Sequence, residues 1–146
     1  MGDDMKNSKD LLASVLKTTQ MGQIGIRSVL KNPIRATLKT ALKSQLEEYD
    51  AIEKEALSIA AKKGWELSDL DPAIKSMTDI MVKTKLYFGD MDSKAAALMI
   101  QGNTRGMIKG LKNLHQINNS DQQISLLTQK LINCEEENIR QMQGFL

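Results

Sequence analysis

Hydrophobic residues recur at alternating steps of four and three between residues 12 and 59, on both sides of Asn32-Pro33. Steps of this size keep side chains on one side of a helix, so each half predicts a helix with one apolar stripe. The stripes are Leu12, Leu16, Thr19, Gln23, Ile26 and Leu30 before the turn, and Leu38, Leu42, Gln45, Tyr49, Ile52, Ala56 and Ile59 after it. Paired outward from the turn, they match layer by layer, which predicts an antiparallel helical hairpin.

The last third of the chain carries the same spacing. Its apolar stripes are Ala96, Ile100, Asn103, Met107, Gly110, Leu114 and Ile117, followed by Ile124, Leu127, Leu131 and Cys134. They pair outward from a turn at Asn118-Asn119, which predicts a second antiparallel hairpin. We expect Cys134 to be a small core residue and not a nucleophile, because His115, the only histidine, lies far along the paired helix.

Cap and breaker residues set the expected limits of the helices. The predicted helices cover residues 9–31, 33–63, 72–88 and 94–118, and a segment after residue 120. The expected caps are Ser8, Asp71, Asp92 or Ser93, and Ser120 with Gln123, while Gly64 is expected to end the second helix. We expect residues 1–7 to be disordered and Trp65 to cover the end of the bundle.

Residues 64–92 form a long connection between the two predicted hairpins. Its short helix is expected to turn one apolar side toward the bundle, namely Ile74, Met77, Met81 and Phe88. Two hairpins joined by a long crossover have the connectivity of a ferritin-like bundle. The sequence therefore predicts an all-α fold, a ferritin-like four-helix bundle with an extra short crossover helix, in a single domain over residues 1–146.

Composition agrees with a helical bundle and narrows the choice of partners. The formal net charge is +2 with 26% charged residues, which gives no reason to expect a nucleic-acid partner. A single cysteine excludes an internal disulfide and a cysteine-based zinc cluster. No apolar run approaches the roughly 20 residues that a membrane span needs. We therefore expect a cytoplasmic protein without a nucleic-acid or membrane partner.

The polar positions of the predicted core decide what chemistry is possible. A di-iron bundle needs a Glu from each of two helices and a Glu-x-x-His pair from each of the other two, and the sequence contains no Glu-x-x-His. We therefore expect no catalytic residue, no cofactor and no bound metal. The remaining candidate ligands are the carboxylates Glu48 and Glu135, which suit a cation such as manganese or magnesium. The amides Gln23, Gln45 and Asn103 are expected to hydrogen-bond one another as a polar core layer that fixes the helix register.

Gly102, Gly106 and Gly110 recur every four residues along one predicted helix. Glycine inside a helix costs about 1 kcal/mol relative to alanine, so three of them require a packing reason. Aligned on one ridge, they allow another helix to approach closely. We expect this ridge to serve either as a self-association face or as a tight crossing with the 72–88 helix, and we expect a homodimer.

Three segments resemble a known family: Gln20-Met21-Gly22-Gln23, Leu46-Glu47-Glu48-Tyr49, and the stretch from Ala97 to Ile108. They are similar to the small ferritin-like proteins of spore-forming Firmicutes, the spore coat F group and its uncharacterised relatives. The resemblance implies a ferritin-like bundle, a bacterial cytoplasmic or spore setting with coat or assembly partners, and no established catalytic activity. The sequence departs from the metal-binding branch of that superfamily in lacking its Glu and His ligands.

Two functions follow from these observations. The first is a non-enzymatic structural or interaction protein, in which the polar core only holds the helices in register. The alternative is a metal-binding or oxidoreductase bundle with a degenerate site at Glu48 and Glu135. They differ in whether the polar core holds a cation or only hydrogen bonds.

Overall fold

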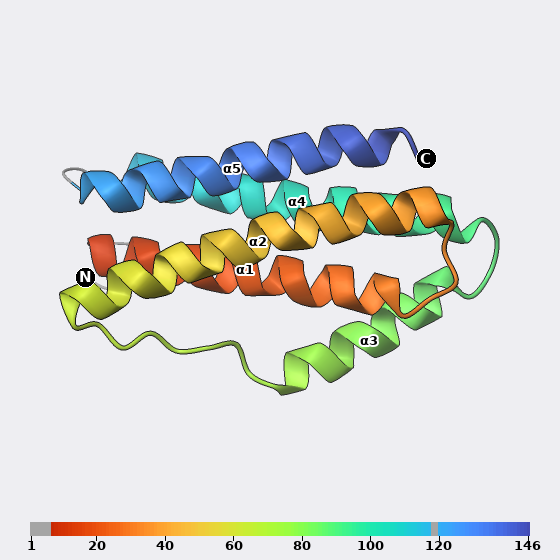
Figure 1. The fold of residues 1–146 in the computed structure, drawn as a ribbon, viewed down its shortest axis with the longest axis horizontal. Coiled ribbons are helices and arrows are strands. Elements are labelled where there is room, and N and C mark those ends of the chain that lie inside the picture. The colour runs from red at the N-terminus through yellow and green to blue at the C-terminus, as the bar shows by residue number, and fades with distance from the viewer. Residues whose placement is uncertain (1–6, 118–119) are drawn as a thin grey trace.

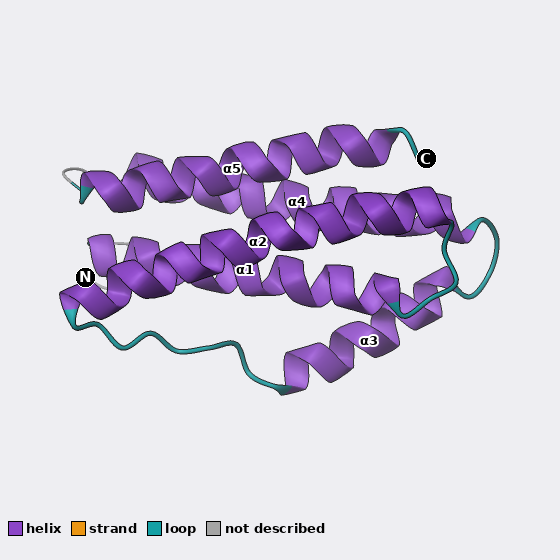
Figure 2. Ribbon diagram, in the orientation of Figure 1, coloured by secondary structure: helices purple, strands orange, loops and turns teal. Residues whose placement is uncertain are grey.

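A computed structural model describes residues 7–117 and 120–146 of the chain, and its regular structure within those ranges is entirely helical (Figure 2). The helices are α1 (Ser8–Leu30), α2 (Ala36–Lys63), α3 (Ala73–Leu86), α4 (Met91–Gln116) and α5 (Gln122–Gln143). This confirms the all-α class. The expectation for residues 1–6 and the turn expected at Asn118-Asn119 lie outside the described residues.

The four long helices form a bundle of two antiparallel hairpins, α1 with α2 and α4 with α5 (Figure 1). The connection from α2 to α4 runs back along the bundle and carries α3, which lies against the outside of α1. Helix α4 therefore starts at the same end of the bundle as α2 and runs parallel to it. The two hairpins and the long crossover agree with the arrangement expected from the sequence.

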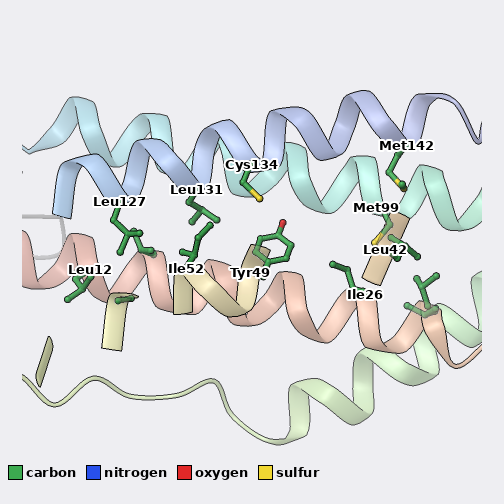
Figure 3. Packing of buried hydrophobic residues seen from close by; sticks show 14 of the residues in the cluster. Leu12, Ile26, Leu42, Tyr49, Ile52, Met99, Leu127, Leu131, Cys134 and Met142 are labelled. Atoms are coloured by element: carbon green, nitrogen blue, oxygen red, sulfur yellow. The ribbon is translucent and has the colours of Figure 1, made fainter. Parts of the chain in front are cut away.

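The apolar stripes form the core between the hairpins. In the first hairpin the stripe positions Leu12, Leu16, Ile26, Leu38, Leu42 and Ile52 are buried. Figure 3 shows Leu12, Ile26, Leu42, Ile52, Leu127 and Leu131 directed into the space between the hairpins. In the last part of the chain the expected positions Ala96, Asn103 and Ile117 are buried. The buried face of α4 is wider than the expected stripe, because Ala95 and Met99 are also buried, while Ile100 and Leu114 are only half-buried.

Several expected caps were wrong because a neighbouring side chain occupies the capping position. Asn7 caps α1 by accepting from the Asp10 N–H at 2.9 Å, and the Ser8 hydroxyl instead accepts from the Asp121 N–H at 2.7 Å. Asp121, and not Ser120, caps α5 through the N–H groups of its first turn. A hydroxyl that joins two distant segments is unavailable for its own helix end. Because Asn7 caps α1, the expectation that residue 7 is disordered was wrong.

The start of α2 and the start of α4 also differ from the expected positions. Helix α2 begins three residues after Pro33, because Ile34 is buried in the core and Arg35 has an extended backbone as the N-cap residue. Helix α4 begins at Met91 with Asp90 as its cap. Asp92 is buried. Its carboxylate accepts hydrogen bonds from the Arg35 backbone N–H at 3.1 Å and from the Arg35 Nε at 2.5 Å. That contact ties the turn between α1 and α2 to the start of α4.

Gly64 ends α2 as expected, with a left-handed φ of +69° that favours glycine. The following Trp65 is half-buried and packs against the core, with the Lys63 Nζ 5.4 Å from its ring centroid. The expected role of Trp65 as a cover for the bundle end agrees with this position.

Helix α3 is rotated relative to the expectation. Its buried residues are Val82 and Leu86, whereas Met77 is 67% exposed and Phe88 is 73% exposed. The reason is the contact with α1, where the Asp79 carboxylate accepts hydrogen bonds from Ser28 and from the Lys31 Nζ. This pair of hydrogen bonds fixes the rotation of α3 and turns its apolar stripe outward.

Candidate functional site

Helices α2, α4 and α5 bring polar side chains together at the middle of the bundle. We call this group the central polar cluster, and its members are Glu48, Tyr49, Asn103, Cys134, Glu135 and Asn138. Figure 3 shows the Tyr49 hydroxyl directed from α2 toward α5, beside the Cys134 side chain. Apart from Glu48, every member is buried.

The Asn103 carbonyl oxygen is the acceptor that joins three helices. It accepts from the Tyr49 hydroxyl of α2 at 2.7 Å and faces the Asn138 Nδ2 of α5 at 3.4 Å. The Asn103 Nδ2 donates to the Met99 carbonyl of its own helix at 2.7 Å. Asn138, which lies beyond the last position of the expected stripe, is therefore part of the centre. Its spacing of four from Cys134 is the signal that could have revealed it.

The Cys134 thiol closes the cluster toward the outside. It donates to the Glu48 Oε2 at 3.1 Å, and both residues line a groove of about 350 Å³ between α2 and α5. Burial and the hydrogen bond to Glu48 raise the pKa of this thiol well above its ordinary value. Because the thiolate is the reactive form of cysteine, this arrangement suits a core residue and not a nucleophile.

Glu135 is the one deeply buried glutamate of the described chain, with 2% of its surface exposed. Burial raises the pKa of its carboxyl to about 8, and the nearby Tyr49 hydroxyl offsets only part of that rise. Within the described residues, no hydrogen-bond partner reaches its Oε1. At neutral pH the carboxyl is therefore mostly protonated and uncharged, which also lowers its value as a metal ligand.

Gly106 makes room for this carboxyl. A Cβ atom on Gly106 would lie 2.1 Å from the Glu135 Oε2, and one on Gly110 would lie 2.8 Å from the Ile132 Cγ1. Both glycines therefore allow α4 to approach α5 in the same chain, and the expected crossing with the 72–88 helix was wrong. Gly102 faces open space, with no atom within 4 Å of its Cβ position. The expected ridge thus separates into two packing glycines and one exposed glycine.

The amides Gln23, Gln45 and Asn103 are all buried, but each bonds a different partner. Gln23 donates to the Asp50 carboxylate at 2.8 Å and to the Glu53 carboxylate at 3.1 Å. Gln45 donates to the Gln141 Oε1 at 2.8 Å. The expectation that the three amides bond one another was wrong, because ionised carboxylates on α2 are stronger acceptors for Gln23 than another amide.

The two metal-ligand candidates, Glu48 and Glu135, both belong to the central polar cluster. In the described ranges, 7–117 and 120–146, no three His, Cys, Asp or Glu side chains are grouped so that they could hold a metal ion. Glu48 is exposed beside the thiol, and Glu135 lies inside with a proton held on its carboxyl. The residues present do not fit the di-iron centre of ferritin-like enzymes, and we derive no step through one.

The comparisons with known proteins add a fold relationship. Neither a family model nor a curated protein sequence matches the chain. Among solved structures, the chain is similar to YcfI from Rhodopseudomonas palustris, which is described as a proposed structural protein. The TM-score is 0.63 at 17% sequence identity, over 100% of this chain and 99% of that chain. A likeness at this identity shows a shared fold. None of the described helices has the length and apolar character to cross a membrane.

Proposed function

We propose that this chain is a non-enzymatic, ferritin-like bundle with a structural or interaction role. The observation that carries the proposal is the Asn103 carbonyl oxygen, which joins α2, α4 and α5 through side chains of the chain itself. A buried polar group that is satisfied in this way favours one register of the helices over its alternatives. In this proposal the polar centre of the bundle is part of the framework.

The protonation states in the central polar cluster support the same role. Burial favours the neutral form of Tyr49, Cys134 and Glu135, since it raises the pKa of all three groups. The neutral thiol of Cys134 is therefore not an activated nucleophile, and the neutral hydroxyl of Tyr49 is not a base.

The cellular setting rests on resemblance. The similarity of three segments to the spore coat F group favours a bacterial cytoplasmic or spore setting with coat or assembly partners. YcfI, which shares the fold, is described as a proposed structural protein, and a structural role for this chain is in keeping with that description.

A specific observation favours one alternative, a cation held by Glu48 and Glu135. The Glu135 Oε1 is buried without a hydrogen-bond partner among the described residues. A divalent cation that displaced the proton would satisfy this oxygen, and the groove beside Glu48 and Cys134 offers an approach. This alternative makes the chain a metal-binding bundle with unusual ligands.

Metal loading separates the two functions. The purified protein is incubated anaerobically with Fe(II) and with Mn(II), and bound metal is measured after removal of the excess. The structural role predicts no stoichiometric metal and no gain in melting temperature. Near-stoichiometric metal that is lost in Glu135→Gln, but kept in the exposed control Glu136→Gln, would overturn the structural role.

A further inference from the structure

Helix α3 carries an apolar surface that the bundle leaves uncovered. Two side chains of the helix, Met77 at 67% and Ile80 at 68%, are mostly exposed, and so are the two that follow its last residue, Tyr87 at 72% and Phe88 at 73%. Met81 lies between them and is 45% exposed. We call these five residues the outer face of α3. Ile80 and Met81 follow Met77 by three and four residues, and Tyr87 and Phe88 follow Ile80 and Met81 by seven, just past the last residue of α3. This spacing places the five residues along one side of the helix and its C-terminal extension.

The outer face cannot be buried by a simple rotation of α3. Val82 and Leu86 already pack into the core on the opposite side of the helix. Asp79 is held by Ser28 and Lys31 of α1, as described above. Single exposed apolar residues are normal on a protein surface, but five exposed large apolar residues on one side of a short helix are typical of an interaction site.

Charged residues lie at opposite ends of this surface. Lys83 and Lys85 are exposed beside its C-terminal half, and Asp71 is exposed in the segment that leads into α3. Asp69 is exposed in the same segment, and its carboxylate accepts a hydrogen bond from the Gln20 Nε2 of α1 at 2.9 Å. Lys75, the other lysine of α3, lies beside the Asp79 carboxylate and lowers the pKa of that group. The outer face is therefore basic at one end and acidic at the other.

This polarity is self-complementary. When two copies of α3 pack antiparallel about a two-fold axis, the lysines of each copy face the aspartates of the other. The helix has 14 residues, which gives a contact length of about 21 Å. An anionic membrane surface would instead be repelled by the acidic end of the same face.

We infer that the outer face of α3 is the interface of a homodimer, in which a second copy of this chain packs its own α3 antiparallel across Met77, Ile80, Met81, Tyr87 and Phe88. The interface depends on the crossover helix α3. It does not use Gly106 or Gly110, because α5 of the same chain packs against both glycines. The inference goes beyond the proposed role and does not depend on what the central polar cluster does.

The mass of the full chain as a function of concentration tests this interface. Sedimentation equilibrium is expected to show a reversible dimer, and Ile80→Lys is expected to weaken it about tenfold or more. Leu126→Lys is the matched control, because Leu126 is 63% exposed on α5, and it is expected to leave the dimer unchanged. Far-UV circular dichroism and a thermal melt check that both variants fold. A monomeric wild type, or equal weakening by both variants, would overturn the interface.

The charge pattern gives a second test. The double variant Lys83→Glu, Lys85→Glu is expected to weaken the dimer, because each substitution then places a carboxylate opposite an aspartate of the other copy. Lys109→Glu, Lys112→Glu makes the same change in net charge on exposed positions of α4 and is expected to leave the dimer unchanged. Equal effects of the two double variants would overturn the antiparallel arrangement. A monomer that sediments with vesicles of phosphatidylserine and phosphatidylcholine, and loses that binding in Ile80→Lys, would assign the face to a membrane instead.

Discussion

Gly22 of α1 lies directly under the ring of Tyr49. A Cβ atom at Gly22 would lie 2.6 Å from the Tyr49 Cζ, which is closer than any real Cβ contact allows. The ring is fixed on its other side by the hydrogen bond of its hydroxyl to Asn103. The glycine therefore sets how closely α1 approaches α2 at the centre of the bundle.

We predict that Gly22→Ala destabilises the protein although alanine is the better helix former. Overpacking against the ring is expected to cost about 1–3 kcal/mol. Gly102→Ala is the control, because its Cβ meets nothing within 4 Å, and it is expected to gain up to about 1 kcal/mol from helix propensity. Urea unfolding of both variants measures the difference. A Gly22→Ala variant as stable as Gly102→Ala would show that the ring moves freely.

Glu135 is expected to give the protein a characteristic pH dependence. Its pKa is raised from an ordinary value of 4.5 to about 8 in the folded state, so the folded protein binds this proton more tightly than the unfolded chain. The contribution to stability is fully present at low pH and is lost as the pH rises through that window, at roughly 1.4 kcal/mol per pH unit.

The variant Glu135→Gln keeps the size of the side chain and removes this titration. Its unfolding free energy relative to wild type is therefore expected to rise steadily between about pH 5 and pH 8. Urea unfolding at a series of pH values measures the two curves. Parallel curves for the two proteins would mean that the carboxyl is ionised or solvated in the folded state.

At the scale of whole elements, one buried carboxylate holds the junction of three helices. Asp92 at the start of α4 is 5% exposed and accepts two hydrogen bonds from Arg35, next to the turn between α1 and α2. Asp92→Ala leaves the backbone N–H without this partner and is expected to cost about 1–3 kcal/mol.

The matched control for Asp92 is a carboxylate in an exposed ion pair. Glu136 lies one turn from Arg140 on the surface of α5, and 57% of its side chain is exposed. Glu136→Ala is expected to cost about 0.5 kcal/mol or less. Thermal unfolding measures the stability that each variant loses. Equal losses would show that the contact between Asp92 and Arg35 stabilises the fold no more than an exposed ion pair does.

The sequence predicted the elements better than their contacts. The stripe positions of α1 and α2, such as Ile26 and Leu42, follow directly from the heptad spacing and were confirmed as buried. The rotation of α3 could not be predicted this way, because its most regular apolar stripe is the exposed one. That rotation is set by Asp79, whose partners are 48 and 51 residues away in the chain. Long-range hydrogen bonds of this kind leave no periodic signal.

The central polar cluster shows the same limit. Asn103 was identified as a buried polar position from its place on a stripe, and Glu135 was identified as a candidate carboxylate. Their actual surroundings depend on Tyr49, which the pattern treats as one more apolar residue, and on Asn138 near the end of the last helix. The polar groups that share the centre come from three helices, so no single stripe contains them.

At the scale of the whole molecule, polar contacts hold the helices at several levels along the bundle. At one end Lys63 of α2 pairs with Asp121 at 2.8 Å, and Asn113 of α4 donates to the Ser14 hydroxyl of α1 at 2.8 Å. The central polar cluster joins the hairpins at the middle. We therefore regard the polar centre as one of the contacts that select the register of the two hairpins.

The most direct test of this view is the coupling energy between Tyr49 and Asn103. Urea unfolding of Tyr49→Phe, Asn103→Ala and the double variant completes a thermodynamic cycle. If the cluster stabilises the fold, each single variant lowers the free energy of unfolding by about 1–3 kcal/mol. The loss in the double variant is then smaller than the sum of the two single losses by about 1 kcal/mol. Losses that add to within about 0.3 kcal/mol would contradict the account, because the two side chains would then not stabilise the fold as a unit.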